Sequence, residues 1–443
     1  MLITIKIGLK MRRVLRILVF GLLALFSSTL AVGAQSDKIA VLEVKGTVNP
    51  VLANYIERGI EEAEESGALA CIIKLDTPGG LDSAMRDIIQ SMDNAKLPIV
   101  VYVPAGARAA SAGFFITIAA DIAAMAPDTA IGAAHPVAMG TEGEAQMSEA
   151  MEDKVVNDAV AYAIGIAESH GRNVEWAEKA VRKAASAPAS EALELNVIDI
   201  VAADLDDLIN QLDGKKATIL GGEEVTLSTQ GSSTQTNPMN FIEGFLYAIA
   251  DPNIAYILLS LAMLGIFFEL SNPGLILPGI VGGICLLLAF FALGMLPVNY
   301  AGVLLIVLAF GLFVAELFTS TFGLFTAGGI VSLVTGSLIL FSGRSPVFQI
   351  NPWLIALVVI LITAFFAFAI NLIIRAHRRQ PATGQEELVG KTAKAKDILD
   401  PEGTVFFKGE RWQAVSEAGR VEPGEEVTIT KVDGLKLFVA KKK

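Results

Sequence analysis

The feature that most constrains this chain is a series of apolar segments between residues 254 and 374. Five of them stand at 254–270, 275–296, 301–318, 323–341 and 353–374, and each comes near the ~20 residues that a helix needs to cross hydrocarbon. Hydrophobic residues make up 53% of the 443-residue chain and charged residues 18%, which is too apolar for an ordinary soluble protein. We therefore predict a membrane domain of about five helices over residues 241–377.

Basic residues give this domain an orientation. Arg375, Arg378 and Arg379 follow the last apolar segment, and such residues favour the cytoplasmic side of a membrane. Five crossings then place the preceding domain outside the cytoplasm, so we predict a multi-pass protein of the cell (inner) membrane. At the N-terminus, basic residues precede an apolar run and the small residues of "AVGAQ". Residues 1–34 are predicted to be a signal peptide, with an uncleaved anchor as the alternative.

Two apolar stretches resemble each other. "GIFFELSNPGLILPGIVGG" and "GLFVAELFTSTFGLFTAGGIV" share a Glu-Leu pair, a short break, a Gly-Leu pair and a glycine pair. The membrane domain therefore reads as a duplicated two-helix unit, with Glu269 and Glu316 at matching places. Two interpretations stay open for these carboxylates. They are either residues of the membrane–water interface or the lining of a polar cavity that admits a substrate or a partner helix.

The flanking parts of the chain have different patterns. Residues 36–215 alternate strand-like and helix-like segments, which predicts an α/β domain of stacked βαβ units. Residues 216–240 are polar and rich in Gly, Ser and Thr, and are predicted to form a short hairpin and a linker. Residues 383–443 carry about five short strands separated by turns. This spacing predicts an all-β barrel of the OB type.

Composition excludes several kinds of partner. The net charge of −12 gives no basic face for nucleic acid. Cys71 and Cys285 lie far apart within apolar runs, so we expect buried thiols rather than a disulfide or a metal site. We expect no cofactor. The bilayer is the one partner that the composition itself requires.

Candidate catalytic residues lie in the α/β domain. Ser111 stands in "ARAASAGFFI" at the start of a helix-like segment, where serine also serves as an ordinary N-cap. Upstream, Gly79 and Gly80 of "DTPGG" would let backbone N–H groups approach a substrate without a side chain between them. With the amide of Ala112, they would form an oxyanion hole for an acyl-transfer reaction at Ser111.

Two residues are candidates for the base that takes the serine proton. Lys154 follows Ser111 by 43 residues on a long predicted helix, and a lysine accepts a proton only when it is neutral, which requires desolvation. His135 follows Ser111 by 24 residues in "IGAAHPV". Imidazole is the common base at neutral pH, but no acidic partner for His135 stands at a recognisable spacing. Position alone leaves both residues open.

The segments "DTPGG", "ARAASAGFFI", "IGAAHPV" and "KVVNDAVAY", together with "PNIAYILLSLAMLGIFFELSNPG" and the C-terminal "LVGKTAKA", resemble the long-form NfeD family, membrane-bound serine peptidases of the ClpP class. The resemblance implies a ClpP/crotonase-like α/β domain, a multi-span membrane domain and a cytoplasmic OB barrel. It assigns a Ser-Lys dyad to Ser111 and Lys154 and the oxyanion loop to Gly79–Gly80. The place of His135 in the sequence resembles that of the catalytic histidine in soluble Clp peptidases, so His135 remains the alternative base.

The family resemblance also implies partners. Its members are associated with stomatin-like (SPFH) membrane proteins, whose apolar C-terminal segments are proposed substrates. We therefore predict a homo-oligomeric serine endopeptidase that cleaves apolar segments of membrane-associated proteins. One alternative is a non-catalytic membrane scaffold for stomatin-like proteins. Another is a crotonase-fold acyl-transfer enzyme for a small molecule, although we identify no CoA-binding feature in the sequence.

Overall fold

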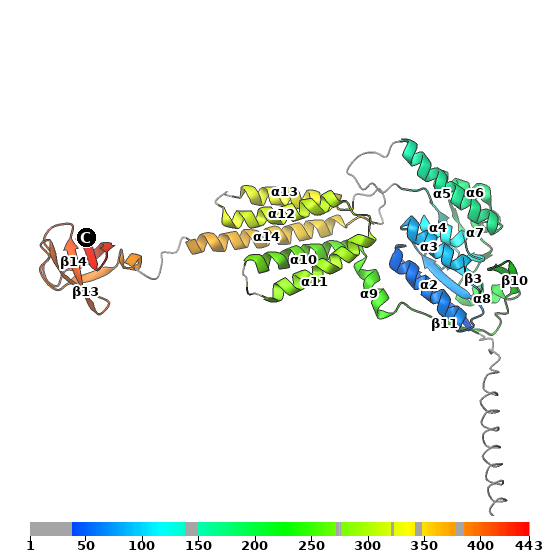
Figure 1. The fold of residues 1–443 in the computed structure, drawn as a ribbon, viewed down its shortest axis with the longest axis horizontal. Helices are drawn as coiled ribbons and strands as arrows, with labels where there is room; N and C mark the ends of the chain where they lie inside the picture. Colours follow the sequence, from blue (N-terminus) through cyan, green and yellow to red (C-terminus); the bar gives the residue numbers. More distant parts are fainter. Residues whose placement is uncertain are drawn as a thin grey trace, which may run out of the picture. The chain divides into compact units, whose positions relative to one another are not determined.

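The computed structural model describes residues 38–137, 149–271, 274, 276–319, 323–341, 348–377 and 385–442 (Figure 1). The chain divides into two compact units, one of residues 1–314 and 327–359 and the other of residues 315–326 and 360–443. The predicted signal peptide at 1–34 lies outside the described residues.

A six-stranded parallel sheet forms the centre of the α/β domain. Its order is β11-β1-β2-β3-β5-β8, and every neighbouring pair is parallel. The strands are β1 (Lys38–Lys45), β2 (Cys71–Asp76), β3 (Ile99–Val103), β5 (Ile122–Met125), β8 (Ile200–Val201) and β11 (Ser233–Thr236). The β-branched runs that predict these strands are apolar on both faces because helices cover both sides of a parallel sheet.

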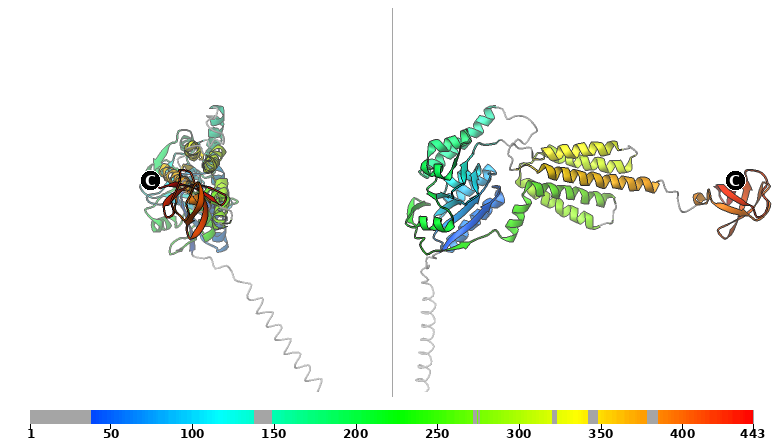
Figure 2. Two further views of the ribbon diagram at one scale, coloured as in Figure 1. Left: turned by 90° about the vertical axis from the view of Figure 1, so that its left-hand side faces the viewer. Right: turned by 180° about the vertical axis from the view of Figure 1, so that it is seen from behind.

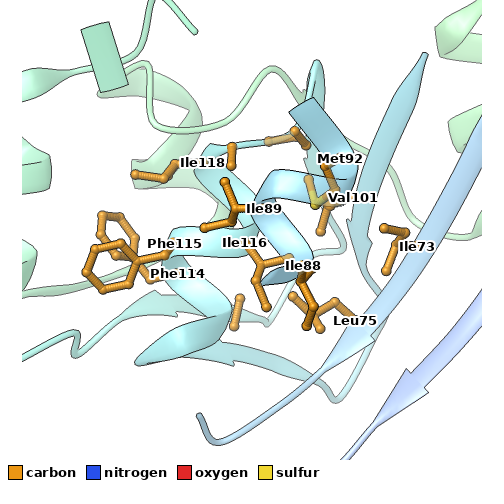
Figure 3. Packing of buried hydrophobic residues seen from close by; sticks show 14 of the residues in the cluster. Ile73, Leu75, Ile88, Ile89, Met92, Val101, Phe114, Phe115, Ile116 and Ile118 are labelled. Atoms are coloured by element: carbon orange, nitrogen blue, oxygen red, sulfur yellow. The ribbon is translucent and has the colours of Figure 1, made fainter. Parts of the chain in front are cut away.

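The described part of the α/β domain has seven helices, which lie between β1 and β11 in the chain. They are α2 (Pro50–Glu65), α3 (Asp82–Asp93), α4 (Ala112–Ile118), α5 (Glu149–Ser169), α6 (Val174–Arg182), α7 (Ala189–Glu194) and α8 (Leu205–Leu212). Figure 3 shows the core between sheet and helices, where Ile73 and Val101 of the strands face Ile88 of α3 and Ile116 of α4. The helix that follows Ser111 is thus buried in the main core, and all seven of its residues are buried.

A second sheet of three short strands lies beside the first. It consists of β4 (Arg108–Ala110), β6 (Ala130–Gly132) and β7 (Ser186–Pro188), in the order β4-β6-β7. β4 and β6 are parallel, whereas β6 and β7 are antiparallel. Strands of three residues leave no periodic pattern in a sequence, so the sequence analysis did not predict this sheet.

The segment interpreted as hairpin and linker contains more structure than expected. β9 (Lys216–Ile219) and β10 (Glu223–Thr226) form the antiparallel hairpin. Residues further along form β11, which pairs with β1 at the edge of the main sheet. The side chains of β11 are all exposed, so this strand is held through its backbone. Its sequence, "STQT", therefore carries no apolar alternation that would have revealed it.

Six helices follow. They are α9 (Phe241–Ile249), α10 (Pro252–Ser271), α11 (Ile276–Met295), α12 (Tyr300–Phe318), α13 (Leu324–Ile339) and α14 (Pro352–His377). Among the described residues, four helices are long and apolar enough to cross a membrane, namely α10, α11, α12 and the part of α14 from Pro352 to Ala369. The fifth predicted span corresponds to α13, which has 16 residues and is shorter than the usual ~20.

The C-terminal residues form a closed barrel of β12 (Thr392–Ala395), β13 (Glu402–Phe407), β14 (Glu410–Ser416), β15 (Glu426–Asp433) and β16 (Lys436–Lys441), in the order β12-β13-β14-β16-β15. A short 3₁₀ helix, η2 (Gln385–Leu388), precedes it. Val405, Ile429 and Val439 are fully buried in its centre. Figure 2 shows this barrel in two further views. The predicted α/β domain, apolar helices and all-β barrel are confirmed.

Candidate active site

Ser111 lies at the junction between β4 and α4 in an unusual backbone conformation. Its φ of 54° and ψ of −115° are values that a residue with a Cβ seldom adopts. The surrounding backbone holds it there, because Ser111 N donates to Gly132 O at 2.9 Å and Phe114 N donates to Ser111 O at 3.0 Å. Strain of this kind costs of order 1–3 kcal/mol and clusters at functional sites. The sequence showed the serine but not its strained backbone.

The Gly79–Gly80 loop packs directly against Ser111. A Cβ added to Gly79, whose φ is +122°, would lie 2.7 Å from Ser111 Cβ and 3.1 Å from Ser111 Oγ. A Cβ added to Gly80 would lie 2.0 Å from Val48 O. Both positions therefore exclude any side chain. The structure brings together the serine and the glycine pair that the sequence analysis singled out.

Thr77 fixes this loop, a role that the sequence analysis missed. Its fully buried side chain accepts a hydrogen bond from Gly79 N at 3.0 Å and donates to Gly79 O at 3.1 Å. Its carbonyl accepts from Ala110 N at 3.1 Å, which joins the loop to the residue before Ser111. The only signal in the sequence was a threonine two residues before the first glycine, a common turn-forming place.

The bonds around Thr77 distinguish the three predicted oxyanion donors. The N–H of Gly79 is already bonded to Thr77 Oγ1. Within the described part of the chain, no hydrogen bond is assigned to the N–H of Gly80 or to that of Ala112, the first residue of α4. These two amides are therefore the groups available to an oxyanion, since the first N–H groups of a helix have no partner within it.

His135 follows β6 by three residues, as Ser111 follows β4 directly. Because β4 and β6 are parallel, with Ala110 opposite Gly132, both residues leave the small sheet at the same edge. The His135 ring is half-buried, and its Nδ1 lies 2.9 Å from Val181 O. A carbonyl oxygen only accepts, so Nδ1 carries the proton of this bond. Nε2 of the neutral ring then carries the lone pair, and no described residue donates a hydrogen bond to it.

Lys154 lies in the second turn of α5 and is exposed. The helix joins the core further along, where Tyr162 stacks on Phe115 of α4 with ring centroids 6.0 Å apart and Ala163 is fully buried. Figure 1 shows the N-terminal end of α5 extending beyond the rest of the α/β domain. Among the described residues, the Lys154 amine has no assigned hydrogen bond or ion pair. The described part of the α/β domain therefore leaves this candidate base exposed.

The two carboxylates of the apolar helices differ in their surroundings. Glu316 is 7% exposed, and it accepts hydrogen bonds from Gly323 N at 2.8 Å and Thr326 N at 3.0 Å. It thus satisfies backbone donors at the start of α13, which explains its burial without a cavity. Glu269 Oε2 is buried without a hydrogen bond among the described residues. The neighbouring residues 272, 273 and 275 lie outside them.

The remaining expectations concern cysteines and metals. Both thiols are free and buried, as expected, and burial raises the pKa of Cys71 to about 12. In the ranges that the structure describes, no group of three or more His, Cys, Asp or Glu side chains is arranged to hold a metal ion.

Comparisons with known proteins cover all three parts of the chain. Residues 38–221 match the N-terminal domain of NfeD1b, residues 253–372 the NfeD integral membrane domain, and residues 385–441 the NfeD-like C-terminal, partner-binding domain. The membrane-bound protease PH1510 of Pyrococcus horikoshii is 37% identical over 414 residues, which are 91% of this chain and 93% of that protein. The membrane protein NfeD1b of Bacillus subtilis is 28% identical over 447 residues, covering 94% and 96%.

A solved structure of a lysine-to-alanine mutant of 1510-N, a membrane-bound stomatin-specific protease, in complex with a substrate peptide is 34% identical. It covers 49% of this chain and 98% of its own, with a TM-score of 0.44. The domain matches and the identity over nearly the whole length define a membrane protein with an N-terminal α/β domain and a C-terminal barrel. The chain belongs to the NfeD family, which confirms the resemblance noted from its motifs.

Proposed function

We propose that this protein is a membrane-bound serine endopeptidase with Ser111 as its nucleophile. The observation that carries the proposal is the strained Ser111 backbone pressed against the Gly79–Gly80 loop, with the N–H groups of Gly80 and Ala112 available beside it. The relationship to a membrane-bound protease, at 37% identity over 91% of the chain, supports the same chemistry.

In the proposed reaction, Ser111 Oγ attacks the carbonyl carbon of a peptide bond while a base takes its proton. The oxyanion of the tetrahedral intermediate accepts hydrogen bonds from the N–H groups of Gly80 and Ala112, and one such donor is worth about 10²–10³ in rate. When the intermediate collapses, the C–N bond breaks and the amine leaves with the proton held by the base. Water then attacks the acyl-Ser111 ester and regenerates the serine.

We assign the base to Lys154 because it carries the lysine of the family's motif, and retain His135 as the alternative. The exposure of Lys154 adds a requirement. A bound substrate or a second copy of the chain must cover the amine before it can act as a neutral base. His135 meets a different requirement already, since the Val181 carbonyl orients its ring and no described residue bonds to its Nε2. Its bond to a carbonyl replaces the carboxylate of the usual triad.

The proposed substrates are apolar segments of membrane-associated proteins, with stomatin-like (SPFH) proteins as the proposed partners. The match of residues 385–441 to a partner-binding domain and the family relationship support a protein partner. We further propose that the protease domain lies outside the cytoplasm and the barrel inside. Arg375, Arg378 and Arg379, which follow the last apolar segment of the sequence, support that orientation.

A non-catalytic scaffold for stomatin-like proteins is the second candidate, favoured by the same partner-binding match. The two functions make opposite predictions in cells. If the protein is a scaffold, the Ser111→Ala variant behaves as the wild type and a chain without residues 383–443 does not. If it is a peptidase, Ser111→Ala has the phenotype of a deletion.

The direct test is cleavage by the full-length protein in lipid vesicles, using peptides that contain apolar segments. Wild type is expected to cleave, and Ser111→Ala is expected to lose the activity because no other side chain replaces the nucleophile. Ser91→Ala is the matched control, since the Ser91 hydroxyl on α3 donates to a backbone carbonyl of its own helix, Asp87 O, and has no other bond among the described residues. Cleavage by Ser111→Ala at the wild-type rate would refute the proposal.

A further inference from the structure

Helix α9 is fixed to the α/β domain along one side. Arg58 of α2 makes a two-pronged ion pair with Glu243, with Nε 2.6 Å from Oε1 and Nη2 2.8 Å from Oε2. This pairing holds the pKa of Glu243 below its usual range. Glu243 also completes a capping box with Asn240 at the start of α9. A partly buried bidentate pair and a capped first turn give the short helix a defined place.

The other side of α9 is apolar and uncovered. Phe241 is 87% exposed, Ile242 67% and Phe245 44%, and a Cβ added to Gly244 would meet nothing within 4 Å. Phe241 and Phe245 are four residues apart and lie on one face of the helix, and Ile242 extends this face because it lies about 100° around the helix from Phe241. The only charged residue of α9 is Glu243, which Arg58 holds. Two exposed phenylalanines and an isoleucine on a short helix mark an interaction surface.

The chain itself indicates what covers this surface. α9 ends at Ile249 and α10, a candidate membrane span, begins at Pro252. Two residues are too few to carry α9 away from the point where the chain enters the bilayer. Figures 1 and 2 show α9 running across the direction of α10 and α11 rather than along it. A helix in the interface plane has this orientation and an apolar side of this kind.

We propose that α9 is an interfacial helix whose exposed side, formed by Phe241, Ile242 and Phe245, inserts between the lipid headgroups and acyl chains of the membrane that α10 spans. The Arg58–Glu243 pair then fixes α2, and with it the α/β domain, to that depth. The orientation of the catalytic domain toward the bilayer is thus set by a defined contact rather than by a free linker.

The test uses the full-length chain with a new thiol on α9. Cys71 and Cys285 are buried, so Phe245→Cys is expected to react selectively with an NBD fluorophore. The labelled protein is reconstituted in vesicles of phosphatidylcholine and phosphatidylglycerol, with and without lipids that carry a doxyl quencher near the headgroup. We expect blue-shifted emission that the doxyl lipids quench. Leu193→Cys on α7, 41% exposed in wild type, is the control and is expected to stay unquenched.

Two results would overturn the proposal. Solvent-like emission at position 245 without quenching would show that the surface faces water. Blue-shifted emission without quenching would show that a protein surface, such as a second copy of the chain, covers it. Ile242→Cys repeats the measurement at a second position, so that a local effect of one substitution does not decide the result.

A second observation connects α9 to the candidate active site. The Tyr247 hydroxyl lies 3.0 Å from Lys45 O and 3.2 Å from Thr47 O, so its proton is shared between the two carbonyls of one turn. Gly46 between them has a φ of +109°, and a Cβ there would lie 2.5 Å from Tyr247 Oη. Burial raises the pKa of Tyr247 to about 12, which keeps the phenol protonated as a donor.

The turn that Tyr247 holds continues into the loop beside Ser111. Val48 N donates to Gly79 O at 2.9 Å, and Leu81 N donates to Val48 O at 2.9 Å. Resting on the function proposed above, we propose that Tyr247 is a positioning residue for the Gly79–Gly80 loop. It acts through the turn from Lys45 to Val48 and sets the place of the oxyanion donors without touching the substrate.

This second proposal is tested with Tyr247→Phe in the full-length protein. Hydrogen exchange is expected to speed up several-fold both in residues 45–49 and in residues 78–82, where the Val48 and Leu81 amides report the two connecting bonds. For peptide cleavage, kcat is expected to fall while KM stays within about twofold, because an oxyanion donor acts mainly in the transition state. Tyr102→Phe is the matched control. It removes a bond of the same kind, to Ala202 O at 3.1 Å.

Faster exchange confined to residues 45–49 would refute the positioning role, as would an equal loss of kcat in Tyr102→Phe. These results remain separate from the fate of the proposed function. If Ser111→Ala cleaves as well as the wild type, the peptidase assignment fails, while the exchange measurement still decides whether Tyr247 holds the loop.

Discussion

At the scale of single residues, the backbone conformation of Ser111 indicates a functional site more strongly than the presence of its hydroxyl group does. Many serines begin helices, but few do so at a φ of 54° and a ψ of −115°. A glycine would adopt this conformation without strain. Because a serine occupies this position despite the strain, we infer that its side chain has a function. The hydrogen bond from Ser111 N to Gly132 O holds the backbone in this conformation.

This reasoning predicts opposite effects on stability and activity at one position. Ser111→Gly relieves the strain and is expected to raise the free energy of unfolding by about 1 kcal/mol, while abolishing cleavage. Ser111→Ala keeps the Cβ and the strain, so its stability should stay near the wild type. Thermal unfolding of the three proteins in the same detergent checks the order. A Ser111→Gly protein less stable than Ser111→Ala would contradict the strain argument.

Asp121 makes the stability of the α/β domain depend on pH. Burial raises its pKa from 3.8 to about 6, although its bond from Ile99 N opposes the shift. The carboxyl is therefore neutral in both states below pH ~4 and carries no penalty there. As the pH rises from ~4 to about 6, the unfolded chain ionises first, and the folded state loses up to about 3 kcal/mol relative to it by the time the pH has passed the folded pKa.

Asp121→Asn removes this ionisation and keeps an oxygen that accepts from Ile99 N. We expect the variant to be more stable than wild type at pH 8 and nearly equal to it at pH 4. Unfolding measured by hydrogen exchange of β3 and β5 at several pH values tests the prediction. A wild-type stability that rises between pH 4 and 7 at this site would refute it.

At the scale of elements, Arg172 joins the end of α4 to the start of β8. Its side chain, 3% exposed, donates to Ile118 O at 2.8 Å, to Ala120 O at 2.7 Å and to Val197 O at 3.3 Å, and pairs with Asp199 at 2.9 Å. A guanidinium has enough donors in a plane to serve several buried carbonyls at once. It anchors the C-terminal end of the helix that Ser111 begins.

Removing this cation is expected to be costly. Arg172→Met leaves buried carbonyls and Asp199 without their donor, so we predict a loss of about 3–5 kcal/mol in the free energy of unfolding. Arg182→Ala is the control on the neighbouring helix, where an exposed pair with Glu178 contributes at most about 1 kcal/mol. Similar losses in both variants, measured by denaturant unfolding, would contradict this account of Arg172.

The sequence predicted the elements in which apolar side chains form a pattern, but not the elements that are held by backbone hydrogen bonds. The buried strands, the long helices and the barrel were predicted because apolar residues recur along them. β11 and the three-residue strands beside Ser111 carry no such pattern, so only their pairing reveals them. The Gly79–Gly80 loop and Ser111 were foreseen as partners. The role of Thr77 in fixing this loop and the exposure of Lys154 depend on tertiary structure, so they could not be predicted from the sequence.

At the scale of the whole molecule, the number of crossings decides on which side each domain lies. Five crossings put the α/β domain and the barrel on opposite sides, and four would put them on the same side. The number depends on α13, whose 16 residues make about 24 Å of helix.

The test uses membrane-impermeant maleimide on intact cells. Leu193→Cys, at a position 41% exposed in the α/β domain, and Leu435→Cys, at one 81% exposed in the barrel, supply the thiols, and Cys71 and Cys285 are buried. We expect Leu193→Cys to react from outside and Leu435→Cys only after permeabilisation. Reaction of both from the same side would refute the five-crossing topology.

The central claim is that Ser111 is a nucleophile, and covalent labelling tests it most directly. The full-length protein in lipid vesicles is treated with a fluorophosphonate, and the modified residue is located by mass spectrometry in wild type, Ser111→Ala, Lys154→Ala and His135→Ala. We predict an adduct on Ser111 that is absent from Ser111→Ala and lost from Lys154→Ala but kept in His135→Ala. Loss only in His135→Ala would move the base to the histidine. An adduct on another residue, with cleavage retained by Ser111→Ala, would contradict the account.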